Sequence, residues 1–248
     1  MTRDPCKDDL KISVSVIIPA HNEEKMIGEC LDSVLDSCRN RLLEIIVVDN
    51  ASTDRTGEVA ASRRGVRILY EEKKGLLHAR SRGLREAKGE FVVYLDADSR
   101  LQEGWIESIE KIVDDEPTIV ALSGAVRYFD ASSWHSIVLR FCWRTIVPAA
   151  YKMVGYMIIG THFVVRKRDL LAVGGFDQTI DFYGEDTDLA RRLSARGKVL
   201  FRSDYFVLTS ARRFAVEGLF KTCFVYAVNF IWPALFWRPF SMSHRDVR

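Results

Sequence analysis

The sequence has few cysteines, and they lack the spacing of a structural framework. Five cysteines occur in 248 residues, an odd number, and no two of them form a C-x-x-C pair. Disulfide scaffolds and structural zinc sites usually depend on paired, closely spaced cysteines. The sequence therefore disfavours both, and a reducing cytoplasmic location is the simpler expectation.

Long apolar runs are also missing. The first eleven residues, MTRDPCKDDLK, contain no apolar core, so we expect no signal peptide. No stretch offers the roughly 20 apolar residues of a typical membrane span. The nearest run, 222–237, is interrupted by Asn229 and Pro233. The segment 218–248 is nevertheless aromatic with basic flanks, a composition that suits peripheral contact with the inner face of a membrane, packing on the core, or an oligomer contact.

No strong excess of charge is present. Lysine and arginine number 36 against 34 acids, which gives a formal net charge of +2. Proteins that bind nucleic acid usually carry a marked basic surplus, so we expect no nucleic-acid partner. The glycine-rich loops of dinucleotide-binding and P-loop proteins are absent as well.

Strand and helix patterns alternate in the first part of the chain. Apolar, β-branched runs lie at 13–20, 43–52, 66–72 and 90–98, separated by segments of helical periodicity at 23–37, 55–64 and 76–88. This alternation predicts an α/β fold, with a mostly parallel central sheet and helices on both faces. Ligands of such sheets bind beyond the carboxyl ends of the strands.

Two acids end the fourth predicted strand, in the sequence FVVYLDADSRL. In a turn just past the strand, Asp96 and Asp98 can converge, and their mutual repulsion would be relieved by a cation. A hard divalent ion that prefers oxygen ligands, Mg²⁺ or Mn²⁺, is the expected partner. Taken alone, this pattern is equally consistent with two acids that cap a turn.

Three further motifs accompany this acid pair: PAHNEE at 19–24, VVDNASTDRT at 47–56 and GFDQTIDFYGEDTDLARRL at 175–193. Together the four motifs resemble glycosyltransferase family 2, whose members have the GT-A nucleotide-diphospho-sugar transferase fold. The resemblance covers roughly 13–202. It implies a catalytic domain at 1–217, with a nucleotide-binding half at about 13–100 and an acceptor half at about 101–217, followed by the apolar segment 218–248.

The resemblance also implies a donor site. Asp49 matches the acid that usually contacts the base, Arg80 matches an arginine that reaches the base or diphosphate, and Asp98 matches the metal ligand, with Asp96 on ribose or water. Ser81 and Lys73 depart from the asparagines common at their positions, and these departures bear on the nucleotide base rather than on the fold. A UDP-sugar is the expected donor. The remaining matching donor-site residues are Pro19, Ala20, Asn22, Glu23, Ala97, Gly160 and Thr161.

The late acid pair, Glu185 and Asp186, matches the family's catalytic acids. The resemblance implies that Asp186 is the general base of an inverting single displacement onto an acceptor hydroxyl or phosphate. The acceptor would be a sugar or a lipid-linked molecule, as in cell-envelope polysaccharide synthesis. Asp186 is equally compatible with a helix cap. Many members also place a metal-binding histidine after the last core strand, where this chain has Thr209 and Ser210.

Two other functions share part of this pattern. A nucleotidyltransferase also has an α/β form and acid pairs, but it would need a basic, glycine-rich loop where this chain has PAHNEE. A sugar-nucleotide-binding scaffold without catalysis would not need the combination of Asp96, Asp98 and Asp186. The sequence therefore favours a metal-dependent glycosyltransferase.

Overall fold

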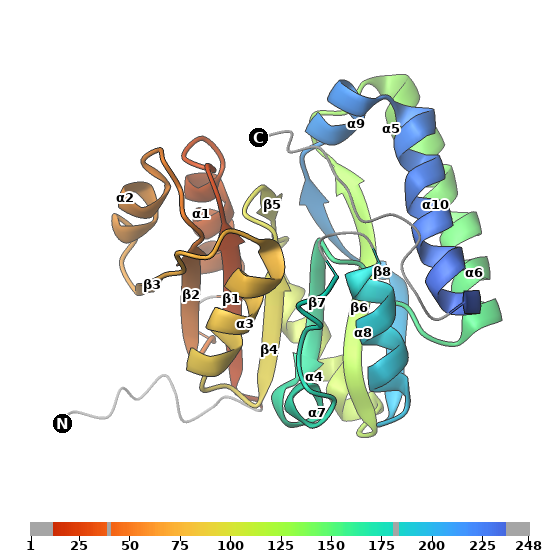
Figure 1. Ribbon diagram of the computed structural model, residues 1–248, viewed down its shortest axis with the longest axis horizontal. Helices are drawn as coiled ribbons and strands as arrows, with labels where there is room; N and C mark the ends of the chain where they lie inside the picture. The colour runs from red at the N-terminus through yellow and green to blue at the C-terminus, as the bar shows by residue number, and fades with distance from the viewer. Residues whose placement is uncertain (1–11, 39–40, 181–183, 237–248) are drawn as a thin grey trace.

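A mixed sheet of eight strands runs through the molecule (Figure 1). The computed structural model describes residues 12–38, 41–180 and 184–236, with side chains described as far as residue 230. The strand order in the sheet is β3-β2-β1-β4-β7-β6-β8-β5. In chain order the strands are β1 Val14–Ala20, β2 Glu44–Asp49, β3 Val66–Tyr70, β4 Phe91–Leu95, β5 Ser99–Arg100, β6 Ile119–Tyr128, β7 His162–Arg166 and β8 Lys198–Thr209.

The first half of the sheet is parallel, as the alternating pattern predicts. β1 pairs in parallel with β2 and β4, and β2 pairs in parallel with β3. β7 then runs antiparallel to both β4 and β6, whereas β6 and β8 are parallel. Because the parallel strands β1, β2 and β4 end at the same edge, the residues that follow them meet there.

Helices cover both faces of this sheet, which confirms the predicted fold class. The helices are α1 Ile27–Cys38, α2 Thr56–Ala61, α3 Leu76–Glu86, α4 Trp105–Asp115, α5 Ser133–Phe141, the π-helical turn η2 Cys142–Ile146, α6 Val147–Val154, α7 Lys167–Ala172, α8 Glu185–Ser194, α9 Arg212–Glu217 and α10 Leu219–Phe236.

Alternation along β1 explains the two cores. Side chains of successive strand residues point to opposite faces. Val16 and Ile18 join the core formed with α1 and α4, whereas Ile17 lies in the core formed with α3, α7 and α8. The strand is therefore buried on both sides, which is typical of a parallel sheet between two helical layers.

A further helical layer lies beside the end of the sheet. α5, η2 and α6 follow one another without a break through 133–154, and α10 runs beside them (Figure 1). Leu139 of α5, Phe214 of α9 and Leu219 of α10 pack into a small core of their own. Within the part of the chain described, no helix is both long and apolar enough to cross a bilayer. Of the predicted segment 218–248, residues 237–248 lie outside the described residues.

Gly124 offers a test of how closely β6 and β8 approach. The pairing register shifts between Gly124 and Ala125, and a Cβ added at Gly124 would lie 1.7 Å from the Tyr205 carbonyl oxygen. Replacing Gly124 with alanine must push the two strands apart. We expect Gly124→Ala to lower the free energy of unfolding by at least ~1–3 kcal/mol in urea titrations.

Gly160→Ala is the matched control for this measurement. A Cβ at Gly160 would meet its nearest neighbours at 3.5 Å, an ordinary contact distance, so its stability should stay near that of the wild type. Equal stability of Gly124→Ala and the wild type would show that the strands do not approach as described.

Candidate active site

The loops after β1 and β2 are fastened to each other at the carboxyl edge of the sheet. Asn22 has a left-handed backbone, with φ of 53°, and its side-chain oxygen accepts a hydrogen bond from the Thr53 amide at 2.8 Å. The Asn22 amide donates to the Ser52 hydroxyl at 3.1 Å, and the Ser52 amide donates to Asp49 Oδ1 at 3.2 Å. Two predicted donor-site residues, Asn22 and Asp49, are thus brought together. Pro19 and Ala20, the last residues of β1, pair with Val48 and Asp49.

Asn50 is a structural residue that the sequence interpretation missed. Its amide nitrogen donates to the carbonyl oxygens of Glu71 and Lys73, at 3.0 and 2.8 Å, and its oxygen accepts from the Gly75 amide at 2.7 Å. These bonds hold the loop that leads into α3. Asn50 directly follows Asp49, the last residue of β2. It therefore carries the same sequence signal as Asp49, a polar residue at the end of a strand.

Glu23 and Asp98 share one arginine. Arg212, the first residue of α9, donates to both carboxylate oxygens of Glu23, at 2.9 and 2.5 Å. The same guanidinium lies 2.9 Å from Asp98 Oδ2. Thr209 donates its hydroxyl to the other oxygen, Asp98 Oδ1, at 3.0 Å. Burial opposes the charge of Arg212, but its bonds to Glu23 and the charge of Asp98 outweigh this and raise its pKa.

Asp96 and Asp98 both lie in the turn after β4, which ends at Leu95. Ala97 between them is buried. The Asp96 amide donates to the Thr161 carbonyl oxygen at 2.9 Å, which ties this turn to the segment before β7. In the described ranges, no three His, Cys, Asp or Glu side chains are grouped as a ready metal site. The acids of this turn contact residues far away in the sequence, Arg212 and Thr209 at Asp98 and Arg80 at Asp96.

Arg80 is buried, with 1% of its surface exposed, and lies among acids. It donates to the Gly160 carbonyl oxygen at 2.7 Å. Its guanidinium nitrogens also lie 3.6 Å from Glu185 Oε1 and 3.9 Å from Asp96 Oδ1. One cation is therefore shared by an acid of the turn after β4 and an acid of α8. This places the late acid pair next to the predicted donor-site acids.

Two aromatic rings complete the surroundings of Arg80. The guanidinium carbon lies 5.5 Å from the ring centre of Phe163 and 5.9 Å from that of Phe176. Such contacts favour the charged guanidinium where water is excluded. The neighbouring Ser81, a departure from the family pattern, accepts a hydrogen bond from Gln178 at 2.8 Å. Gln178 follows Phe176 closely, so this contact anchors the same segment.

Glu185 and Asp186 begin α8. Asp186 Oδ1 accepts from the Thr187 amide at 2.7 Å, and Oδ2 accepts from the Gly160 amide at 3.3 Å. Burial and the charge of Asp186, partly offset by Arg80, raise the pKa of Glu185 to about 8. Burial also raises the pKa of Asp186, against the opposing effect of its bond from Thr187. At neutral pH the pair therefore retains a proton.

His162 does not take part in the site. Its side chain, in β7, is fully buried. Burial lowers its pKa to about 3, so it is neutral. Its ring lies 5.4 Å from that of Tyr205. It is therefore a packed histidine.

Known proteins share both the fold and the sequence pattern of this chain. The sheet and its flanking helices have the GT-A glycosyltransferase fold. The structure superposes on a mannosyltransferase from Pyrobaculum calidifontis in complex with GDP-mannose and Mn²⁺, with a TM-score of 0.67 and 24% identity over 82% of this chain and 58% of that one. The family profile described as Glycosyl transferase family 2 matches residues 15–174, more than half of the chain. The chain belongs to this family.

Two further relatives show the same likeness. Glucosyl-3-phosphoglycerate synthase from Mycobacterium tuberculosis, solved with Mn²⁺, UDP and phosphoglyceric acid, has a TM-score of 0.61 and 18% identity, covering 91% of this chain and 79% of that one. Glycosyltransferase GlyG of Streptococcus pneumoniae serotype 4 is 32% identical over 120 residues, which cover 46% of this chain and 40% of GlyG. The matched region thus spans less than half of that relative's length.

The protonated state of the acid pair predicts a pH dependence of stability. The pKa of Glu185 is about 8 in the folded protein, above the ordinary value of 4.5. Between these values the folded state binds more protons than the unfolded chain, so stability falls as pH rises. We expect the wild type to lose stability relative to Glu185→Gln as pH rises from about 5 to 8, measured by urea unfolding at each pH.

Glu58→Gln provides the comparison, because Glu58 is an exposed residue of α2. Its stability should follow the wild-type curve across the same range. Wild-type and Glu185→Gln curves that run parallel would contradict the raised pKa.

Proposed function

We propose that the chain is an inverting, metal-dependent glycosyltransferase that moves a sugar from a nucleoside-diphospho-sugar to an acceptor. The observation that carries the proposal is the shared contact of Arg80. It lies between Asp96, on the donor side, and Glu185, beside the proposed base Asp186. The acids proposed to bind the donor and the acids proposed to act on the acceptor therefore lie at one site. Membership of the family supports this assignment.

The donor is proposed to lie along the edge formed by β1, β2 and β4. Asp49 would accept a hydrogen bond from the base, and Pro19, Ala20 and Asn22 would line the nucleotide. Asp49 is suited to this because its own loop is already fixed by the Ser52 amide. A UDP-sugar is the expected donor. The two similar solved structures hold GDP-mannose and UDP, so the base is the feature that a binding assay must decide.

Asp98 and Asp96 are the residues proposed to hold Mg²⁺ or Mn²⁺. Their carboxylate oxygens are the ligands these hard ions prefer, and such ions are often held by one or two carboxylates together with substrate phosphates. The donor set therefore fits an ion whose shell is completed by the donor diphosphate. A bound ion would stabilise charge on the leaving nucleoside diphosphate. Arg212, now paired with Asp98, would adjust to leave that carboxylate available and to face the diphosphate.

Asp186 is proposed to accept the proton of the acceptor hydroxyl as its oxygen attacks the anomeric carbon. We place the retained proton on Glu185, because burial and the charge of Asp186 raise its pKa, and Asp186 would then be the carboxylate. Burial brings the pKa of Asp186 nearer to neutral pH, which improves a general base. Direct displacement by the acceptor oxygen, with Asp186 as its base, would invert the anomeric carbon and release the nucleoside diphosphate.

The role of Arg80 changes from that implied by the sequence. The family resemblance suggested contact with the base or diphosphate, but Arg80 is 1% exposed and bonded to the Gly160 carbonyl oxygen. We propose that it positions Asp96 and Glu185 and keeps Gly160 and Thr161 in place for the sugar. Arg80 is then a positioning residue.

The acceptor is proposed to be a sugar or a lipid-linked molecule of cell-envelope polysaccharide synthesis, presented by its hydroxyl or phosphate. The helical layer of α5, α6 and α10 adjoins the site through Asp130, whose carboxylate accepts bonds from Ser210 and the Ala211 amide at 2.6 and 2.5 Å. Arg212 follows directly. This neighbour relation supports an acceptor that arrives from the side of the helical layer.

Donor binding should depend on the metal and on Asp98. We expect one nucleotide sugar in a panel of UDP- and GDP-sugars to raise the melting temperature of the wild type in the presence of Mn²⁺, and to be slowly hydrolysed. Asp98→Asn should lose the Mn²⁺-dependent part of the affinity for the nucleoside diphosphate, measured by calorimetry, because a metal ligand is removed. If no donor binds with or without Mn²⁺, the proposed function is wrong.

Removal of the proposed base should separate binding from catalysis. Asp186→Asn keeps the size of the side chain and can accept from one of the two amides, Thr187 or Gly160, but it cannot accept the proton. We expect unchanged donor affinity and a transfer rate reduced by ~10²–10⁴-fold. Asp204→Asn, an exposed acid of β8, is the control and should transfer normally. Wild-type turnover of Asp186→Asn would exclude Asp186 as the base.

A further inference from the structure

The helical layer beside the sheet, α5, η2, α6 and α10, carries cations but no acids. The continuous helix formed by α5, η2 and α6, residues 133–154, contains Arg140, Arg144 and Lys152 but no aspartate or glutamate. α10 contains Lys221 and likewise no acid. In the whole chain, acids and cations are nearly balanced, with 34 against 36. The absence of acids is therefore a local property of this layer.

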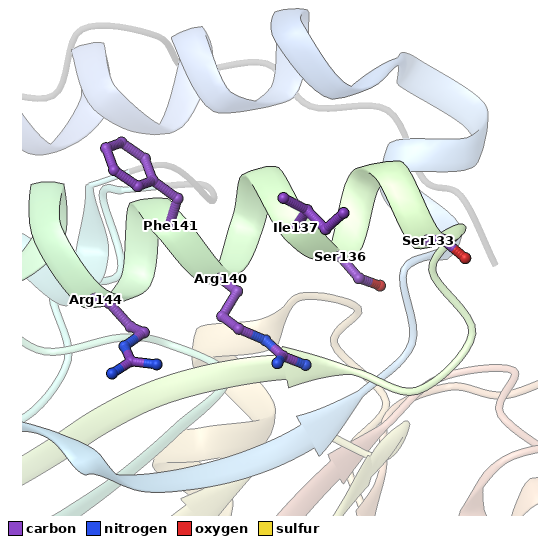
Figure 2. A pocket seen from close by; sticks show the side chains of 6 residues that line it. All are labelled: Ser133, Ser136, Ile137, Arg140, Phe141 and Arg144. Carbon is purple, nitrogen blue, oxygen red and sulfur yellow. The ribbon is translucent and has the colours of Figure 1, made fainter.

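A hollow of about 440 Å³ lies along one side of this helix (Figure 2). Arg140 and Arg144 extend along one edge of it, and Ile137 and Phe141 along the other. The lining residues recur at the spacing of one helical face. They are Ser133, Ser136, Ile137, Arg140, Phe141 and Arg144. One face of the helix thus combines guanidinium groups with apolar side chains.

The arginines of this face form no ion pair with any described residue. Partial burial lowers the pKa of Arg127, a residue of β6, and the charges of Arg140 and Arg144 lower it further. Its guanidinium lies 3.5 Å from the ring centre of Phe206, and no carboxylate neutralises it within the described chain. Among the described residues, these three cations therefore influence one another without a carboxylate paired to any of them.

Large apolar side chains of the same layer are exposed to solvent. Ile137 and Phe141 are 64% and 60% exposed, and Trp134 at the start of α5 is 62% exposed. On α10, Phe220 and Phe224 are 78% and 69% exposed. A cluster of exposed apolar side chains on one layer marks an interaction surface. Its partner must accept apolar side chains and supply negative charge.

We infer that the face of Ile137, Arg140, Phe141 and Arg144 binds the surface of an anionic lipid bilayer. Helices that lie in a membrane interface combine arginine and lysine with aromatic and aliphatic residues, as this face does. The arginines would pair with anionic headgroups, and Ile137 and Phe141 would enter the boundary with the acyl chains. This surface is distinct from the edge that carries Asp96 and Asp98, so the inference does not depend on the proposed transfer reaction.

Charge disfavours the other occupants of this face. A second copy arranged about a two-fold axis would place Arg140 and Arg144 opposite the same arginines. Residues 237–248 lie outside the described part of the chain, but their sequence carries Arg238, Arg245 and Arg248 against the single acid Asp246. A second copy and residues 237–248 would each bring further positive charge to Arg140 and Arg144, which need negative charge beside them. An anionic bilayer supplies negative charge to the arginines and accepts the apolar side chains of Ile137 and Phe141.

Vesicle sedimentation of the full chain tests this inference. We expect binding to vesicles that contain phosphatidylglycerol, weak binding to pure phosphatidylcholine, and a decrease as salt is raised. The double variant Arg140→Gln with Arg144→Gln should reduce the partition coefficient on anionic vesicles by about 25-fold, since each cation near such a surface contributes about 5-fold. Ile137→Ser with Phe141→Ser should also weaken binding, but it should leave the salt dependence.

The matched control is Arg64→Gln with Lys88→Gln, which removes the same charge from exposed positions outside the helical layer. It should bind anionic vesicles like the wild type. Equal binding by the Arg140 and Arg144 double variant, or absence of wild-type binding to anionic vesicles, would overturn the inference. So would a wild-type dimer that does not bind vesicles and that the arginine variant converts to a monomer, as judged by sedimentation velocity.

Discussion

The buried guanidinium of Arg80 is the interaction on which the arrangement of the acids depends. It brings together the turn after β4, the loop before β7 and the start of α8 through Asp96, Gly160 and Glu185. Removing one partner of a buried ion pair typically costs about 3–5 kcal/mol, because the other charge is left uncompensated. Each of these segments is therefore stabilised in place by the same cation.

The backbone allows this placement because α3 approaches β1 closely at Gly83. A Cβ on Gly83 would stand 2.5 Å from Ile17 Cγ2, so only glycine permits the approach. Arg212 serves the donor side in a similar way, since it joins Glu23 of the first loop to Asp98 of the turn after β4. Two arginines from distant parts of the chain thus compensate the acids at one edge of the sheet.

The sequence predicted what depends on local periodicity. Residues at the strand ends, such as Asp49 and Asp96, were found because parallel strands must end together. The pairing of Arg212 with Glu23 was not found, because it joins residues far apart in the chain and leaves no periodic signal. The helix at 133–154 was missed for a different reason. Pro148 interrupts the pattern, yet the helix continues through it directly after the π-helical turn η2, and π-turns and prolines are both sites where the hydrogen-bond ladder of a helix is locally broken.

Thr209 donates its hydroxyl to Asp98 and thus orients that carboxylate. Under the proposed function, Thr209 would act as a residue behind the metal ligand Asp98, at a place where many family members have a histidine. The charge beside Asp98 is supplied by Arg212, which a neutral histidine would not provide. Under the proposed function, the donor diphosphate would therefore meet a guanidinium as well as the ion. Because an arginine fork binds phosphate oxygens in pairs, this arrangement would favour the diphosphate itself over a single charged group.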